Sequence, residues 1–132
     1  MLGVTARQHK SSCPRTSQFS VQIRFLATFD TAGKFRPPLR HLRVNGVELS
    51  YSEQGTGAPV VFVHGAFSNL RIWEAQRQAV AQQYRFIPDN RRYHGTAPWP
   101  DEGQHYAAAT HAADLAAFIR QLNAGSVHLV AH

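Results

Sequence analysis

The chain has 132 residues, of which 43% are apolar and 17% are charged, as is usual for a small globular domain. The formal net charge is +6, but eight of the fourteen Lys and Arg residues and only one of the eight acids fall in residues 1–43. Residues 44–132 are therefore close to neutral and show no basic stripe, which argues against nucleic-acid binding by the folded part.

Cys13 is the single cysteine, so no intrachain disulfide can form. This is compatible with a reducing compartment. No apolar run approaches the ~20 residues that span a bilayer. No apolar signal-peptide region follows the first residue. We therefore expect a cytoplasmic protein that binds neither a membrane nor nucleic acid.

Residues 1–38 form a basic leader with scattered Ser, Thr and Arg and a single acid. This composition is typical of an organellar transit peptide, but between Phe19 and Phe25 apolar and polar residues alternate as in a β-strand. We favour a disordered tail, or an over-extended start site, over a targeting signal. Pro37-Pro38 marks the boundary because consecutive prolines stop regular structure. The sequence therefore predicts a disordered leader at 1–38 and a folded domain at 39–132.

A β-hairpin is predicted directly after the boundary. Apolar and polar residues alternate on both sides of Asn45-Gly46, a dipeptide that favours positive φ at both positions, as a type I′ turn requires. The alternation indicates one solvated face, as at the edge of a sheet. Gly57 and Pro59 punctuate a loop into the run 60–63, three Val and one Phe, which is typical of a fully buried strand in a parallel sheet.

The buried strand ends on His64-Gly65, where glycine permits a backbone conformation or a close approach that a Cβ would forbid. Apolar residues at helical spacing then predict a helix over 72–83, and a short strand is predicted over 84–88.

The clearest helix is predicted over 106–123, with one apolar face and an Asn-Ala-Gly stop. Its apolar face consists of Ala108, Ala112, Leu115, Phe118, Ile119 and Leu122. Residues 126–132 are predicted to form another buried strand. The order ββ, βα, βα, β is that of the first half of a mostly parallel sheet.

The order strand, His-Gly turn, polar bend and helix resembles the loop after the third strand of the α/β-hydrolase fold. In that family a backbone N–H just after the His-Gly pair is one of the two donors of the oxyanion hole. The resemblance implies that His64 and Gly65 shape the loop and that the donor is the N–H of Ala66 or Phe67. Trp73 and Phe67 are candidates for the wall of a substrate pocket, although aromatic residues beside a strand end are at least as often part of the core.

The stretch from Asp89 to Thr96 resembles the family pattern Asp-x-Arg-Gly-x-Gly-x-Ser after the fourth strand. Arg92 and His94 occupy the two usual glycine positions, so positive φ is not expected at both of them, and Gly95 is expected to take over part of that role. We interpret His94 as a surface loop histidine, and Asp89 as a residue that caps or braces the loop.

The resemblance covers about residues 40–132 and implies an α/β fold, the first half of an α/β-hydrolase sheet, incomplete, with an N-terminal β-hairpin followed by parallel strands and crossover helices. In the family the strand corresponding to 127–131 leads into the nucleophile elbow, so the nucleophile would follow His132, and the acid and the histidine would come later. We therefore expect no catalytic residue within the chain and no activity of the chain alone. The full-length form would hydrolyse a small-molecule ester, amide or epoxide through a Ser or Asp nucleophile, with no cofactor and no metal.

Other functions remain open. The chain could be a truncated, non-catalytic remnant, or a small module that binds a partner through the open edge of its last strand, an edge that would favour aggregation if exposed. Nucleic-acid binding through the basic leader is the weakest alternative. His105 and His111 are six residues apart and do not share a helical face, so no metal pair is expected. The sequence indicates no oligomeric state.

Overall fold

The computed structural model describes residues 28–29 and 35–132, so most of the predicted leader, including the segment between Phe19 and Phe25, lies outside the described residues. Within the leader, Thr28–Phe29 (β1) and Phe35–Arg36 (β2) form a short antiparallel pair. The disorder expected for the leader and its boundary at residue 38 stay predictions.

The predicted hairpin is formed by Arg40–Val44 (β3) and Val47–Tyr51 (β4), which pair antiparallel. Asn45 and Gly46 connect them with φ angles of 46° and 80°. Both are in the left-handed region, which confirms the positive φ expected at the two turn positions.

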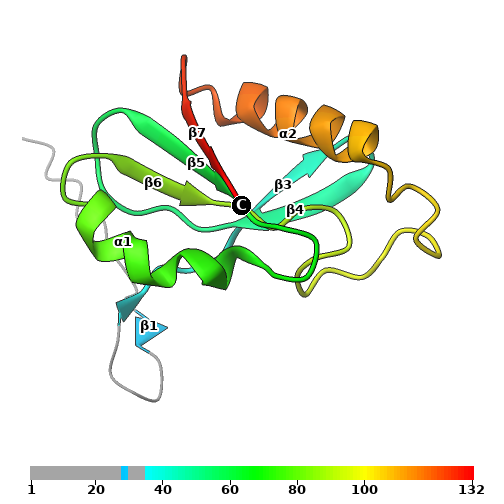
Figure 1. Cartoon of the computed structure of the whole chain (residues 1–132), viewed down its shortest axis with the longest axis horizontal. Helices are drawn as coiled ribbons and strands as arrows, with labels where there is room; N and C mark the ends of the chain where they lie inside the picture. Colours follow the sequence, from blue (N-terminus) through cyan, green and yellow to red (C-terminus); the bar gives the residue numbers. More distant parts are fainter. Residues whose placement is uncertain (1–27, 30–34) are drawn as a thin grey trace, which may run out of the picture.

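The central strand Pro59–Val63 (β5) pairs in parallel with Arg85–Pro88 (β6) on one side and with His128–Ala131 (β7) on the other. Two isolated antiparallel bridges, the first between Tyr51 and Asp89, join the end of the hairpin to the β6 side of this sheet. Figure 1 shows the hairpin and the parallel strands in this arrangement. A hairpin followed by parallel strands with intervening helices is the architecture that the sequence predicts.

The predicted helix over 72–83 consists of two parts, a 3-10 turn at Leu70–Trp73 (η1) and the α-helix Glu74–Val80 (α1). The Asn69 side chain caps η1 by accepting a hydrogen bond of 3.0 Å from the N–H of Arg71. The second long helix is Ala108–Leu122 (α2), which lies within the predicted range 106–123.

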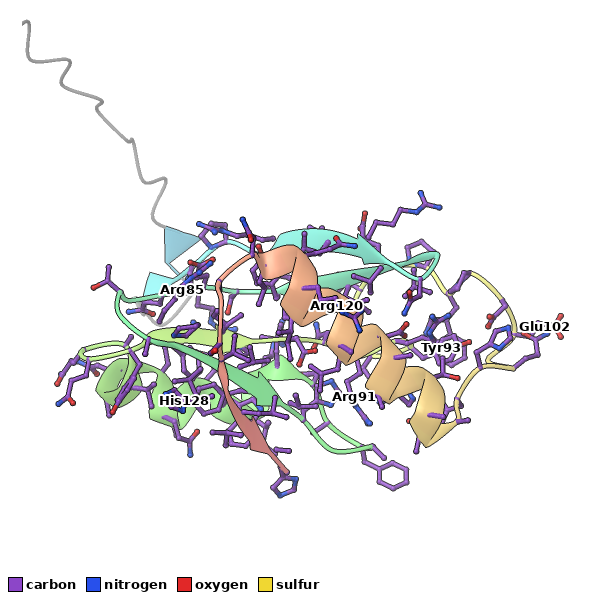
Figure 2. The ribbon with its side chains drawn as sticks, turned by 90° about the horizontal axis from the view of Figure 1, so that it is seen from above. Arg85, Arg91, Tyr93, Glu102, Arg120 and His128 are labelled. Carbon is purple, nitrogen blue, oxygen red and sulfur yellow. The ribbon has the colours of Figure 1, made fainter. Side chains whose placement is uncertain are left out.

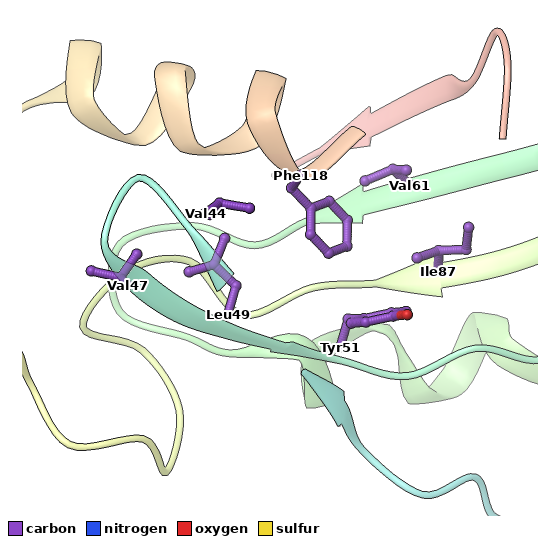
Figure 3. Close-up of a cluster of buried hydrophobic side chains, with 7 residues drawn as sticks. All are labelled: Val44, Val47, Leu49, Tyr51, Val61, Ile87 and Phe118. Atoms are coloured by element: carbon purple, nitrogen blue, oxygen red, sulfur yellow. The ribbon is translucent and has the colours of Figure 1, made fainter. Parts of the chain in front are cut away.

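Helices α1 and α2 cover opposite faces of the sheet (Figure 1). Because successive strand residues point to opposite faces, Val61 and Ile87 pack towards α2, and Phe62 and Phe86 pack towards α1. The larger core, on the α2 side, is drawn in Figure 3 and consists of Val44, Val47, Leu49, Tyr51, Val61, Ile87 and Phe118.

Strand β7 differs from the prediction of a buried strand, because all four of its residues are exposed. Leu129 is 52% exposed and Val130 is 37% exposed. Among residues 28–29 and 35–132, β7 pairs with β5 alone, which leaves its other edge open. In the same part of the chain, no helix is both long and apolar enough to cross a bilayer.

Candidate active site

The loop of residues 64–69 follows β5 at the carboxyl end of the parallel strands, and His64 is its first residue. The His64 side chain is 1% exposed, and its Nε2 accepts a hydrogen bond of 3.1 Å from the N–H of Arg91. The proton is therefore on Nδ1, which donates to the Gly65 carbonyl oxygen at 2.7 Å. Burial lowers the pKa of His64 to about 4, so the ring is neutral at neutral pH. His64 thus shapes the loop through its hydrogen bonds.

Gly65 allows the close approach that the sequence suggested. A Cβ built at Gly65 would lie 3.2 Å from Nδ1 and 3.3 Å from the carbonyl oxygen of His132. The N–H of His132 donates to the Val63 carbonyl oxygen at 3.1 Å, which holds the chain after β7 in this place. The glycine is required here by the proximity of the two segments, since its φ is not positive.

The carbonyl group of Ala66 is also held by a histidine. Nε2 of His94 lies 2.7 Å from the Ala66 carbonyl oxygen, and the Tyr106 hydroxyl donates to the same oxygen at 3.4 Å. In a trans peptide the C=O and the following N–H point in opposite directions, so the N–H of Phe67 points away from His94. Neither Ala66 nor Phe67 donates its N–H to another residue within the described ranges. Two backbone donors with fixed directions are therefore available at this loop.

The two aromatic residues considered for a pocket wall have different surroundings. Phe67 is fully exposed, which rules it out as a core residue. Trp73 packs against Phe62, with ring centroids 5.2 Å apart, and its ring centroid lies 6.4 Å from that of His132 in an edge-to-face arrangement. A cavity of about 320 Å³ lies elsewhere, with Arg71 and Asn90 in its lining, and Trp73 does not line it. A pocket role for Trp73 stays a prediction.

The loop after β6 takes positive φ at Tyr93 (66°) and Gly95 (138°), and not at Arg92 or His94. The expectation that Gly95 replaces part of the glycine pattern is confirmed. A Cβ at Gly95 would also lie 3.0 Å from Nδ2 of Asn90. The positive φ of Tyr93 was not foreseen from the sequence.

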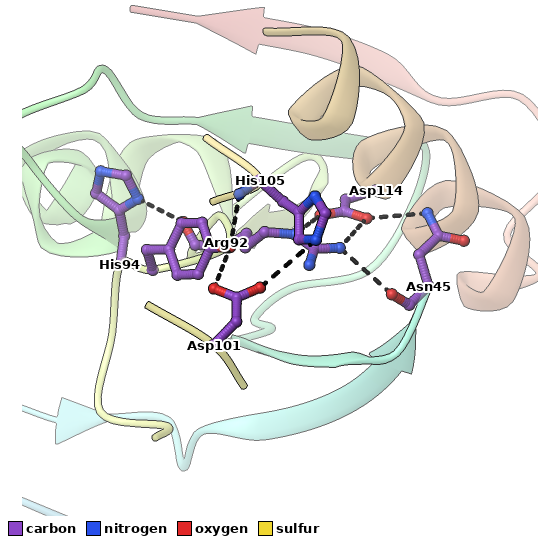
Figure 4. Close-up of polar contacts among 7 residues, drawn as sticks. Asn45, Arg92, His94, Asp101, His105 and Asp114 are labelled. Atoms are coloured by element: carbon purple, nitrogen blue, oxygen red, sulfur yellow. Dashed lines mark hydrogen bonds and ion pairs between the residues drawn. The ribbon is translucent and has the colours of Figure 1, made fainter. Parts of the chain in front are cut away.

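Arg92 is a buried residue that the sequence analysis treated only as a departure from the family pattern. Its guanidinium group contacts both oxygens of Asp114 on α2, at 2.7 and 3.0 Å, and donates to the Asn45 carbonyl oxygen at 3.3 Å (Figure 4). The Asn45 side chain in turn donates to Asp114 at 2.9 Å. The loop after β6, the hairpin turn and α2 are thereby joined. The sequence offered a signal for this ion pair at Asp114, which lies four residues before the core residue Phe118 on the same helix face. An acid on the buried face of a helix needs a cationic partner.

The interpretation of His94 as a surface loop histidine is corrected, because the residue is half-buried and its ring binds the Ala66 carbonyl oxygen. Its ring lies 4.8 Å from that of His64 and 6.3 Å from that of His111. The sequence offered one signal for this role, a histidine at a position where the family has glycine.

Three polar side chains near this loop have buried atoms that lack hydrogen-bond partners among the described residues. They are Oδ1 of Asp89, Nε and Nη2 of Arg91, and both ring nitrogens of His111. Burial raises the pKa of Asp89 to about 7, opposed by its own backbone N–H and by the charge of Arg91. Figure 2 shows Arg91 near α2. The bracing role expected for Asp89 stays a prediction, and no group of three potential metal ligands occurs in the described part of the chain.

Helices on both faces of a parallel sheet, and a loop with free backbone donors at the end of its central strand, define a hydrolase-like arrangement. A family model described as alpha/beta hydrolase fold matches residues 58–132. The chain therefore belongs to the alpha/beta hydrolase fold family.

Two curated relatives illustrate the similarity. The chain is 40% identical over 89 residues to a non-heme chloroperoxidase of Kitasatospora aureofaciens and 32% identical over 92 residues to an epoxide hydrolase of Caballeronia sordidicola. These alignments cover 67% and 69% of this chain, but 32% and 28% of the two relatives. A crystal structure of an epoxide hydrolase from Vigna radiata matches with a TM-score of 0.67 and 31% identity, over 72% of this chain and 31% of that one. The chain thus spans about a third of the length of these relatives.

Proposed function

We propose that the whole protein hydrolyses a small-molecule ester, amide or epoxide through a covalent intermediate, and that the loop 64–69 supplies a backbone donor to its oxyanion hole. The observation that carries this proposal is the free N–H of Phe67, whose peptide plane is fixed by the bonds from His94 and Tyr106 to the Ala66 carbonyl oxygen. Fixed donors of this kind contribute roughly 10²–10³ in rate where they have been removed from enzymes.

The position of the loop supports the proposal. In the family the nucleophile follows the strand that corresponds to β7, and the end of β7 lies against Gly65. A nucleophile next after His132 would therefore attack a substrate carbon beside the loop. In ester hydrolysis the carbonyl oxygen gains negative charge, and the Phe67 N–H would donate to it. We expect the chain of 132 residues to be inactive by itself, because the nucleophile, acid and histidine of the family all come after this strand.

The test begins with the coding sequence after the codon for His132. A Ser followed by x-Gly selects acyl chemistry, and an Asp at the same place selects epoxide opening. The longer product is then assayed with p-nitrophenyl acetate and with styrene oxide, with the 132-residue chain as the control, and a covalent intermediate is sought by mass spectrometry. Turnover by the longer product alone supports the proposal. An in-frame stop codon, or turnover by the 132-residue chain, overturns it.

A non-catalytic module that binds a partner strand is the second candidate, favoured by the open edge of β7 and its exposed apolar residues. It predicts that the chain associates through this edge and that Val130→Lys abolishes the association. Sedimentation of the parent chain and of the Val130→Lys variant would decide, since equal self-association of the two would contradict binding along β7.

A further inference from the structure

The two ring nitrogens of His94 both face groups that can only accept a hydrogen bond. Nδ1 lies 2.8 Å from the Arg92 carbonyl oxygen, and Nε2 lies 2.7 Å from the Ala66 carbonyl oxygen. Neutral imidazole has one N–H, so one of these contacts would place a lone pair against a carbonyl oxygen. Both contacts are favourable only when both nitrogens carry protons. The geometry therefore favours a doubly protonated ring.

Tyr106 fits this assignment. Its hydroxyl oxygen lies 3.1 Å from Nε2 of His94, and its hydroxyl proton can point to the Ala66 carbonyl oxygen at 3.4 Å. The Nε2–H is then shared between the Ala66 and Tyr106 oxygens, and every donor has an acceptor. His64 shows the opposite pattern, because the Arg91 N–H occupies its Nε2 and leaves one proton on the ring.

We propose that doubly protonated His94 is the positioning residue that fixes the direction of the Phe67 N–H in the oxyanion loop. The inference rests on the proposed function and adds the group that sets this donor. His94 holds the carbonyl of the same planar peptide unit that carries the N–H, so a rotation of this unit would break the short bond to Ala66. The positive ring also makes the peptide a better donor, because a cation bound to the carbonyl polarises the N–H.

The titratable groups near His94 include three rings and a guanidinium group. They are His64 on the oxyanion loop, Tyr106 and His111 at the start of α2, and Arg91 on its own loop. The second proton is held by the two carbonyl oxygens and the Tyr106 hydroxyl. With a single ring proton, one of the two contacts would be repulsive and the hold on the Ala66 carbonyl group would be weaker.

The first experiment does not depend on hydrolysis. The 132-residue chain is labelled with 15N-histidine, and its ring nitrogen shifts are followed with pH by NMR. These shifts distinguish a protonated ring nitrogen from a bare one. The His94 signals are assigned as those that disappear in His94→Gln. At mildly acidic pH we expect two protonated nitrogens on His94 and a bare Nε2 on His64. If one ring nitrogen of His94 becomes bare as the pH rises, the amide shift of Phe67 should change over the same pH range. A His94 ring that keeps one bare nitrogen throughout, or a Phe67 amide that does not respond, overturns the proposal.

The second experiment uses the longer, active product. His94→Leu should lower kcat roughly tenfold or more with little change in KM, because a misdirected donor affects the transition state more than substrate binding. His94→Gln keeps an N–H that can reach Ala66 and should restore much of kcat. His105→Gln, at an exposed histidine of the same loop, is the matched control. Full kcat in His94→Leu, or no recovery of kcat in His94→Gln, contradicts the proposal. If the longer product hydrolyses nothing, the proposed function fails, and the NMR result still decides the state of His94.

Discussion

The loops after β5 and β6 come from neighbouring parallel strands, yet different groups hold them. In the loop after β5, the carbonyl groups of Gly65 and Ala66 are held by histidine rings. The loop after β6 reaches outward with its own side chains, Arg92 to α2 and His94 to the first loop. The two loops therefore hold one another. Nε2 of His64 accepts the N–H of Arg91, and the His94 ring binds the Ala66 carbonyl group. The two side chains that depart from the family pattern, Arg92 and His94, make the contacts that reach out of the loop after β6.

This difference gives the two departures from glycine a physical meaning. Glycine at both positions would allow positive φ there, but it would provide no side chain to contact α2 or Ala66. Here Tyr93 and Gly95 take the positive φ angles, and the two positions where the family has glycine carry Arg92 and His94. The predictions below test whether the second loop really has this role.

The largest effect is expected for Arg92→Ala. Asp114 is 2% exposed, and without Arg92 it would stay buried with one remaining contact, from Asn45. Loss of one partner of a buried ion pair costs about 3–5 kcal/mol, so the free energy of unfolding in urea should fall by that amount. Arg120→Ala, at an exposed position of the same helix, should change it by less than ~0.5 kcal/mol.

A double variant separates the pair from a general effect of truncation. Arg92→Ala combined with Asp114→Ala should be less destabilised than the sum of the two single variants, because the second change removes the unpaired charge. Simple additivity would mean that the two side chains do not stabilise one another.

The next largest effect concerns pH, because the two loops carry buried groups with opposite titration behaviour. Burial lowers the pKa of His64 from 6.5 to about 4, so the unfolded chain binds more protons in this window and His64 makes stability fall as pH falls from 6.5 to 4. Burial raises the pKa of Asp89 from 3.8 to about 7. The folded chain then binds more protons, and the stability from Asp89, complete below pH 3.8, is lost as pH rises towards 7.

Asp89→Asn removes one of these opposing contributions. Each pKa unit corresponds to about 1.4 kcal/mol, so between pH 4 and pH 6.5 the stability of the variant relative to the parent should rise by about 3 kcal/mol. Urea unfolding at several pH values measures it. Parallel stability curves for the two chains would show that Asp89 is ionised in the folded state across this range.

The sequence was most informative where one local rule determines the structure. Asn45-Gly46 specified a turn with two positive φ angles, and the Val-rich run specified the central strand. The pairing of Arg92 with Asp114 and of His94 with Ala66 joins residues 22 and 28 positions apart. No periodicity or turn rule relates such positions, so these contacts could not be predicted. The exposure of β7 could not be predicted either. Its apolar composition indicated a buried strand, but burial depends on the elements that pack beside it.

A smaller effect is expected at the contact between Gly65 and the end of β7. Gly65→Ala would place a methyl group 3.2 Å from the His132 ring, which must move by a few tenths of an ångström. Because His132 is exposed and can shift, we expect a loss of about 1 kcal/mol in unfolding free energy. Ser68→Ala, in the same loop, should have a smaller effect because its hydroxyl makes one long bond of 3.4 Å. Equal losses would mean that the contact with His132 does not require glycine.

The smallest effect on stability, and a clear effect on solubility, is expected for Val130→Lys. Val130 is 37% exposed on a strand whose outer edge has no partner among the described residues. A charge on such an edge discourages pairing with another chain, while an exposed substitution changes folding by less than ~0.5 kcal/mol. The saturation concentration of the 132-residue chain should therefore rise while its urea midpoint stays the same. An unchanged saturation concentration would mean that this edge does not mediate self-association. A large drop in the midpoint would mean that Val130 supports the strand that brings His132 to Gly65, and that the oxyanion loop depends on β7 as well as on the loop after β6.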